Sequence, residues 1–309
     1  MTHNVIASKF FIDKVRDNCA EHSRTTAISC NSRLSWFPLS AAVSDNQAAM
    51  RRLTQSYART WLGLMVALGL VACAANGPPE AAPDGFVFES FQADGKAESV
   101  VVLAPGCGGV SDKDHTQPMR PLARRLSAHG HHVVIADYES AYGMKRTCHG
   151  GARLEDVADA IALAADQGRV AAGLSDPIAL VGWSLGGSGV FLAGDRAGAD
   201  RVVALYPDCT PFASLSVHID YLVLAGAEDR LTPLSECAGI RARSEANGAE
   251  WVIYPETYHG FDYKAFRGGL SGQRNASRDS FVAVKYDAEV AEDAHRRILD
   301  FLDRDDTAD

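Results

Sequence analysis

The fold is decided by residues 178–187, which read Ile178-Ala179-Leu180-Val181-Gly182-Trp183-Ser184-Leu185-Gly186-Gly187. The apolar run at its start is typical of a buried parallel strand. Residues 185–197 are rich in small residues and predict a helix. Glycines two positions before and after Ser184 remove side chains that would collide in a tight turn. The stretch therefore predicts a strand, a sharp turn with Ser184 at its tip, and a helix.

Strand-like and helix-like segments alternate on both sides of this stretch. We expect strands at 86–91, 100–104, 133–136, 178–182, 202–206, 221–225 and 251–254, and helices at 118–129, 154–165, 185–197, from Pro233, and at 288–302. This alternation predicts an α/β fold over residues 84–305, with a mostly parallel central sheet and helices on both faces. In such sheets ligands bind at the carboxyl ends of the strands. We therefore expect the site in the loops after residues 104, 137, 182, 207, 225 and 255.

Ser184 stands where an exposed nucleophile is expected. The residues around it match the pattern Gly-x-Ser-x-Gly, in which a strained strand-to-helix turn lifts a serine hydroxyl above the sheet. The helix N-terminus also favours negative charge that develops during a reaction. A plain turn with a serine cap would explain the motif alone. Partner residues elsewhere in the chain therefore decide between the two interpretations.

Two later loops supply such partners. Asp229 follows the 221–225 strand and is the candidate acid that orients the base, with Glu228 as the alternative. Of ten histidines, only His259 lies in the loop after the 251–254 strand. It is the candidate base that would take the proton of Ser184. The order Ser, Asp, His along the chain is the α/β-hydrolase order.

A glycine-rich loop, Pro105-Gly106-Cys107-Gly108-Gly109, follows the 100–104 strand. Acyl transfer needs two backbone N–H groups directed at the oxyanion. We expect Leu185, directly after the nucleophile, to supply one of them. Cys107 is the candidate for the second, with Gly106 as the alternative. The loop lacks the Lys and Ser/Thr of a phosphate-binding P-loop.

Together these segments resemble the dienelactone hydrolase-like family of α/β-hydrolases over about residues 84–303. The resemblance rests on residues 106–109, 182–187, 226–233 and 259–261. It implies a hydrolase with the α/β-hydrolase fold. Dienelactone hydrolase itself uses a cysteine nucleophile, so Ser184 favours a general hydrolase of small carboxylic esters or lactones that works through an acyl-enzyme. A peptidase or amidase with the same triad, and a binding protein with an unused hydrolase scaffold, are the alternatives.

The first 83 residues are expected to lie outside this domain. Residues 1–49 have no sustained period and are interpreted as disordered or as an artefact of the gene start. After Met50, three arginines precede the apolar run 61–72, which has signal-peptide length and is shorter than the roughly 20 residues of a membrane span. Leu70-Val71-Ala72-Cys73 resembles the bacterial lipobox; a short buried helix that ends in Cys is the alternative. The resemblance implies a signal peptide at 50–72, lipidation of Cys73 and a linker at 73–83.

A lipobox implies an exported protein with a lipid anchor, on the periplasmic or cell-surface face of a membrane. Ala74, in place of Asp, favours the outer membrane. Export makes disulfides possible for the four cysteines of the predicted domain, which allow three pairings. The loops of Cys209 and Cys237 follow consecutive strands, which favours this pair and leaves Cys107 with Cys148. Four buried thiols are the alternative.

The net charge and the spacing of Cys and His residues argue against some classes of function. The formal net charge is −9, which argues against a nucleic-acid surface. No Cys-x-x-Cys or His-x-x-x-His spacing occurs, so we expect no metal and no cofactor.

Trp183, Tyr258 and Phe261 flank catalytic candidates and either line an apolar pocket or pack in the core. Residues 262–285 are expected to form a surface loop, with a lid or a site for acidic substrates as alternatives.

Overall fold

The computed structural model describes residues 86–110, 118–143, 147–149, 152–268, 271–275 and 280–304. The segment 1–49, the proposed signal peptide at 50–72, Cys73 and the linker up to residue 83 lie outside the described residues. The expectations about them therefore stay predictions. Among the described residues, no helix combines the length and the apolar character that crossing a bilayer requires.

Seven strands form one sheet in the order β1-β3-β2-β4-β5-β6-β7. Neighbouring strands are parallel, except that β1 runs antiparallel to β3. The mostly parallel sheet predicted from the sequence is therefore confirmed, and β4 is its central strand. The strands are β1 (Glu89–Phe91), β2 (Ser99–Ala104), β3 (His131–Ile135), β4 (Ile178–Trp183), β5 (Arg201–Leu205), β6 (Asp220–Gly226) and β7 (Glu250–Tyr254).

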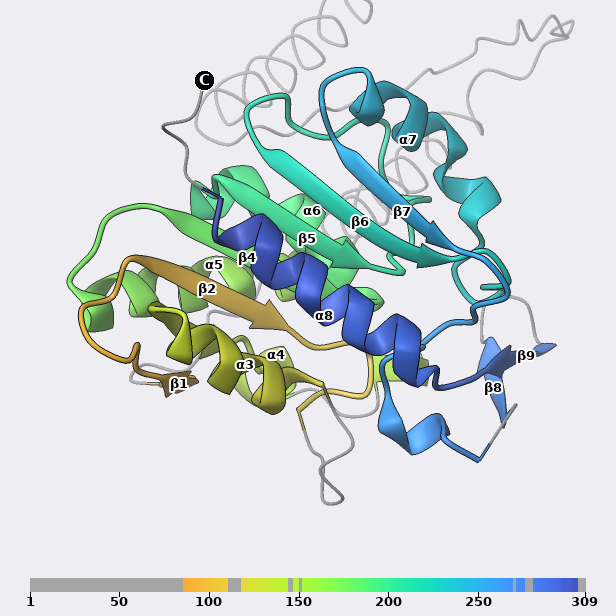
Figure 1. Cartoon of the computed structure of the whole chain (residues 1–309), viewed down its shortest axis with the longest axis horizontal. Helices are drawn as coiled ribbons and strands as arrows, with labels where there is room; N and C mark the ends of the chain where they lie inside the picture. Colours follow the sequence, from red (N-terminus) through yellow and green to blue (C-terminus); the bar gives the residue numbers. More distant parts are fainter. Residues whose placement is uncertain are drawn as a thin grey trace, which may run out of the picture. The chain divides into compact units, whose positions relative to one another are not determined.

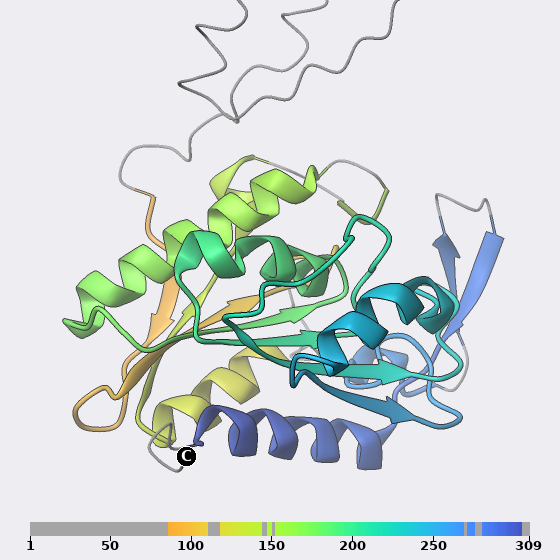
Figure 2. The same ribbon diagram turned by 90° about the horizontal axis from the view of Figure 1, so that it is seen from above.

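Helices cover both faces of this sheet (Figures 1 and 2). On one face lie α5 (Leu154–Ala172), α6 (Leu185–Ala197) and α7 (Ala238–Glu245), and on the other lie α3 (Met119–Ala128) and α8 (Ala288–Leu302). Each face encloses its own apolar core, because the central strands are buried on both sides. The shorter elements are α4 (Tyr138–Ala141) and the 3-10 turns η1 (Thr147–His149), η2 (Leu234–Cys237) and η3 (Lys264–Phe266).

Small residues bring the two central helices of one face close to their neighbours. A Cβ on Gly189 of α6 would lie 2.7 Å from Val157 Cγ1 of α5. A Cβ on Gly168 of α5 would lie 2.4 Å from Val100 Cγ1 of β2. The glycines therefore let α6 pack closely against α5, and α5 pack closely against the sheet.

The structure corrects the prediction for residues 262–285. The segment is not a simple surface loop, because η3 is followed by an antiparallel hairpin of β8 (Ser271–Asn275) and β9 (Ser280–Val284). The residues of β9 include two valines and a phenylalanine, types that favour strands. Val284 also forms an isolated parallel bridge with His259. The hairpin, seen beyond the arrowheads of β6 and β7 in Figure 1, thus supports the loop of the candidate base.

Candidate active site

Ser184 lies on a strained turn at the end of the central strand. It follows Trp183, the last residue of β4, and caps α6 with φ 51° and ψ −113°. A positive φ is uncommon in residues other than glycine and marks local strain. The Ser184 N–H donates to the Leu205 carbonyl of β5 at 2.9 Å, which holds the turn against the sheet. The structure therefore contains a sharp strand-to-helix turn with Ser184 at its tip.

Two glycines make room for this turn. A Cβ on Gly182 would lie 2.1 Å from the carbonyl oxygen of Gly186. A Cβ on Gly186 would lie 2.3 Å from the carbonyl oxygen of Ala104. Both obstacles are backbone atoms, which cannot move aside as a flexible side chain can. The ends of β2 and β4 and the start of α6 therefore meet at backbone contact.

His259 and Asp229 reach Ser184 from two other loops. His259 Nε2 lies 3.0 Å from Ser184 Oγ, and His259 Nδ1 lies 2.7 Å from Asp229 Oδ2. Asp229 follows β6 and His259 follows β7, so three strand ends contribute one residue each. His259 is 6% exposed and Asp229 is 4% exposed. With a carboxylate at Nδ1, the ring carries its proton there, and Nε2 can accept the serine proton.

Four donors stabilise Asp229 as a carboxylate. Oδ1 accepts the N–H groups of Leu231 (2.8 Å) and Thr232 (3.0 Å), and Oδ2 accepts His259 Nδ1 and Thr232 Oγ1 (2.9 Å). Burial raises the pKa of Asp229, but the attraction and hydrogen bond of His259 and the bonds from Thr232 lower it more, so its net pKa lies below 3.8. Asp229 is therefore ionised at neutral pH. Thr232 was not singled out by the sequence, although it lies three residues after Asp229.

The other residues that the sequence offered as site candidates are not part of the hydrogen-bonded series of Ser184, His259 and Asp229. The Glu228 side chain, the alternative acid, is 45% exposed and lies 3.9 Å from Arg230. Trp183 and Phe261 are fully buried in the core, and Tyr258 is half-buried. Packing is therefore the role that the structure gives to the first two of these aromatic residues.

The glycine-rich loop after β2 lies beside Ser184. A Cβ on Gly106 would lie 3.4 Å from Ser184 Cβ and 3.7 Å from the Tyr263 hydroxyl oxygen. Leu185 begins α6 directly after Ser184. Within the described part of the chain, the N–H groups of Leu185 and Cys107 have no protein acceptor. Their role as donors to an oxyanion stays a prediction.

Three contacts support this loop. Tyr138 of α4 donates its hydroxyl to the Gly106 carbonyl at 2.6 Å, and Thr147 donates to the Cys107 carbonyl at 2.6 Å. A disulfide joins Cys107 to Cys148. The second disulfide joins Cys209, after β5, to Cys237 of η2. Neither Tyr138 nor Thr147 leaves a local pattern in the sequence, because each acts on a residue more than thirty positions away.

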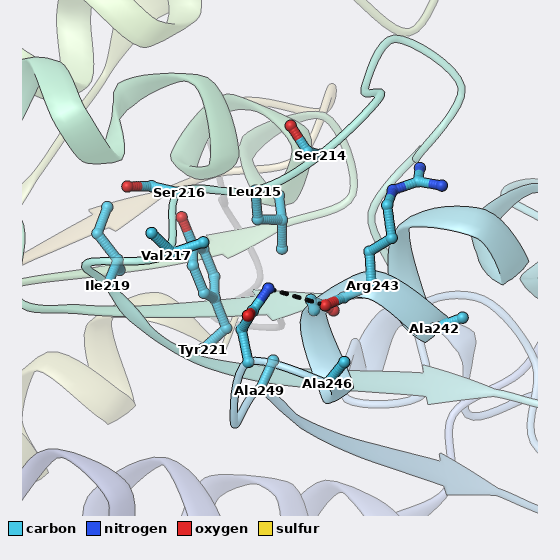
Figure 3. A pocket seen from close by; sticks show the side chains of 12 residues that line it. Ser214, Leu215, Ser216, Val217, Ile219, Tyr221, Ala242, Arg243, Ala246 and Ala249 are labelled. Carbon is cyan, nitrogen blue, oxygen red and sulfur yellow. Dashed lines mark hydrogen bonds between the residues drawn. The ribbon is translucent and has the colours of Figure 1, made fainter.

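A separate pocket of about 440 Å³ lies at the opposite, amino-terminal edge of the sheet (Figure 3). Its walls come from the loop before β6, from the start of β6 and from α7. Neither Ser184 nor its partners contribute to it. Among the described residues, no three His, Cys, Asp or Glu side chains gather closely enough to hold a metal ion. The arrangement at the carboxyl edge is instead suited to nucleophilic attack by a serine.

Several solved structures are similar to this chain. A protein from Klebsiella pneumoniae named as a candidate dienelactone hydrolase is 21% identical, with a TM-score of 0.54 over 72% of this chain and 97% of that chain. P91, a dienelactone hydrolase-like promiscuous phosphotriesterase from metagenomic libraries, is 18% identical, with a TM-score of 0.48 over 71% and 87%. Est1E from Butyrivibrio proteoclasticus is 15% identical, with a TM-score of 0.47 over 72% and 98%.

No curated protein matches the sequence. The profile described as "Dienelactone hydrolase family" matches residues 84–305. This range contains the whole seven-stranded sheet and the loops of Ser184, Asp229 and His259. The fold is the α/β-hydrolase fold, and the chain belongs to the dienelactone hydrolase family.

Proposed function

We propose that this protein is a serine hydrolase that cleaves small carboxylic esters, lactones included, through an acyl-enzyme. The observation that supports this most directly is the hydrogen-bonded series from Asp229 through His259 to Ser184, on a strained turn between strand and helix. A serine hydroxyl is a weak nucleophile, and an adjacent oriented base activates it. The family match supports a hydrolase, and the serine favours general ester hydrolysis.

The first half of the reaction forms the acyl-enzyme. Ser184 Oγ attacks the ester carbonyl carbon while His259 Nε2 takes the hydroxyl proton. Asp229 stabilises the imidazolium that results. The carbonyl oxygen becomes an oxyanion, which the N–H groups of Leu185 and Cys107 would bind. The intermediate then collapses, His259 returns the proton to the alkoxide, and the alcohol departs.

The second half releases the acid. A water molecule takes the place of the alcohol and attacks the acyl carbonyl while His259 Nε2 removes one of its protons. The second intermediate collapses, and the same proton returns to Ser184 Oγ. The net reaction is ester plus water to acid plus alcohol, and the enzyme is regenerated without a cofactor.

A fluorophosphonate probe tests the nucleophile. We expect the native protein to be labelled and Ser184→Ala to be unlabelled. Ser175→Ala is a matched control, because Ser175 is an exposed serine just before the same strand. Absence of labelling in the native protein would favour a binding protein instead.

A substrate panel tests the bond type. Short p-nitrophenyl esters, lactones and matching amides should be compared by kcat/KM. We expect esters and lactones to be turned over far faster than amides. Preference for the amides would replace the proposal with a peptidase or amidase.

We further propose that the domain is exported and held at the membrane by a lipid on Cys73. The two disulfides support this location, because such bonds persist mainly in oxidising compartments. Intact mass spectrometry of the membrane fraction tests the proposal. The expected mass corresponds to a chain that starts at Cys73 and carries lipid, and an unprocessed chain that starts at Met1 would refute it.

A further inference from the structure

Asp262 is a buried carboxylate, three residues after His259, that the proposed reaction does not use. Its side chain is 0% exposed. Oδ2 accepts the indole N–H of Trp183 at 2.7 Å, and Oδ1 accepts the hydroxyl of Tyr206 at 2.6 Å. A carboxylate removed from water is costly unless it is hydrogen-bonded. Asp262 therefore depends on Trp183 and Tyr206 for its position, and these two side chains depend on Asp262 for theirs.

The first donor belongs to the strand of the nucleophile. Trp183 is the last residue of β4, directly before Ser184, and is fully buried. Its hydrogen bond to Asp262 holds the indole, and through the shared peptide it restricts the backbone that sets the φ of Ser184. A shift of this side chain would move the serine hydroxyl relative to His259 Nε2.

The second donor contacts the base. The Tyr206 ring lies 4.6 Å from the His259 ring, at 58° between the planes. The Tyr206 carbonyl oxygen also lies 3.0 Å from Thr232 Oγ1, the hydroxyl that donates to Asp229 Oδ2. Burial, and next the charge of Asp262, raise the pKa of Tyr206 well above its usual value, so the hydroxyl stays protonated and remains a donor.

The loop of Asp262 is itself well fixed. The N–H of Asp287 donates to the Phe261 carbonyl at 2.8 Å, and the N–H of Tyr263 donates to the Gly260 carbonyl at 2.9 Å. His295 Nε2 lies 3.7 Å from Asp262 Oδ2, which is too long for a hydrogen bond. One rigid loop thus contains the base and a carboxylate that reaches the residues beside the nucleophile.

We propose that Asp262 is a positioning residue, which holds Trp183 and Tyr206 so that Ser184 and His259 stay within hydrogen-bond distance. This inference rests on the serine-hydrolase function proposed above. Asp262 does not touch the reacting atoms and acts only through its two donors. Its loss should therefore reduce the rate of acylation more than it weakens substrate binding, because a displacement of about 1 Å can cost about a hundredfold in rate.

Four single variants test this role. Asp262→Ala removes both acceptors, Asp262→Asn keeps one, and Tyr206→Phe removes one donor but keeps the ring against His259. Asp293→Asn is the control, because Asp293 also accepts a tyrosine hydroxyl, that of Tyr254 at 2.9 Å, but its side chain is 29% exposed and pairs with Arg296 and Arg297 on α8. Near-ultraviolet circular dichroism identifies the variants that fold. If Asp262→Ala does not fold, Asp262→Asn and Tyr206→Phe are enough to test the role.

We expect kcat for a p-nitrophenyl ester to fall about tenfold in Asp262→Asn and about a hundredfold in Asp262→Ala, with KM nearly unchanged. The double variant Asp262→Asn/Tyr206→Phe should lose less than the product of the two single effects, since both substitutions alter the same contact between residues 262 and 206. Asp293→Asn should keep its kcat. Native kcat in folded Asp262 variants, or an equal loss in the control, would overturn the inference.

A second readout does not depend on ester turnover. The proton magnetic resonance of His259 Nδ1–H reports its hydrogen bond to Asp229. We expect this signal to shift or broaden in Asp262→Asn and to stay in place in Asp293→Asn. If the native protein fails to hydrolyse esters, the proposed function fails, and this signal still decides whether Asp262 positions His259. An unchanged signal in a folded Asp262→Asn would refute the positioning role.

Discussion

The two disulfides allow catalysis to be separated from stability. We consider two double variants, Cys107→Ala/Cys148→Ala and Cys209→Ala/Cys237→Ala. The first releases the loop of a proposed oxyanion donor. The second releases the loop after β5, which contributes neither the triad nor the oxyanion donors. Each variant is therefore the control for the other.

The expected losses of stability are nearly equal. The bridges close loops with sequence separations of 41 and 28 residues. Loop-closure entropy then gives losses of about 3.9 and about 3.6 kcal/mol in the free energy of unfolding. Burial opposes this small difference in loop length: Cys209 and Cys237 are 1% and 3% exposed, so the second variant also loses some packing. The variant without the 107–148 bridge should thus be at most a few tenths of a kcal/mol less stable than the other variant.

The expected losses of activity differ. Removal of one oxyanion donor costs about 10²–10³-fold in kcat in serine hydrolases. The loop keeps the hydrogen bonds from Tyr138 and Thr147 after the bridge is lost. We therefore expect only part of that penalty, about tenfold to a hundredfold, in Cys107→Ala/Cys148→Ala. Cys209→Ala/Cys237→Ala should remain within about threefold of the native kcat.

Urea unfolding measures the stabilities, and initial rates of p-nitrophenyl ester hydrolysis at a temperature where all proteins are folded measure kcat. Equal losses of kcat in both variants would show that the 107–148 bridge acts only through general stability. Native kcat without that bridge would refute its role in holding the oxyanion loop.

Three further predictions concern single residues. Asp229→Asn should lower kcat by about 10⁴-fold with little change in KM, because the wrong histidine tautomer is stabilised; steady-state kinetics measure this. Gly186→Ala should cost about 3 kcal/mol or more in urea unfolding, because its Cβ would lie 2.3 Å from the Ala104 carbonyl oxygen, whereas Gly268→Ala, with nothing within 4 Å, should be nearly neutral. Burial raises the pKa of Tyr206 well above 10.0, so its contribution to stability is complete below pH 10.0 and is lost as the pH rises toward the folded pKa. Unfolding experiments at about pH 9 and about pH 11 should therefore show a smaller loss in Tyr206→Phe than in the native protein.

Much of this architecture could be predicted from local patterns. Apolar runs of four or five residues marked the parallel strands, and the glycines around Ser184 marked the turn, because both constraints act within a few residues. The parallel direction of the strands adds a second constraint, because the carboxyl ends of parallel strands meet at one edge of the sheet. That rule directed attention to the loops of Asp229 and His259, which the structure brings together with Ser184.

The parts that could not be predicted depend on contacts between distant segments. Asp262 lies 79 residues from Trp183 and 56 from Tyr206, so no periodicity in the sequence connects them. Helix α4 (Tyr138–Ala141) is too short for a 3.6-residue period to be visible. The hairpin of β8 and β9 could not be predicted, because β8 reads Ser-Gly-Gln-Arg-Asn and has no apolar residue, although Val282 and Val284 of β9 are buried.

Under the proposed function, the central position of β4 would divide the catalytic tasks between two halves of the sheet. The loop that would bind the oxyanion leaves β2 on one side, and the acid and base leave β6 and β7 on the other. A substrate of the proposed reaction would therefore bridge the two halves across the end of β4, with its carbonyl oxygen toward one and its leaving group toward the other. Recognition of the carbonyl can then be altered by changes beside β2 and β3 without disturbing proton transfer. Mutant libraries confined to that half would explore substrate scope while they leave the proton relay intact.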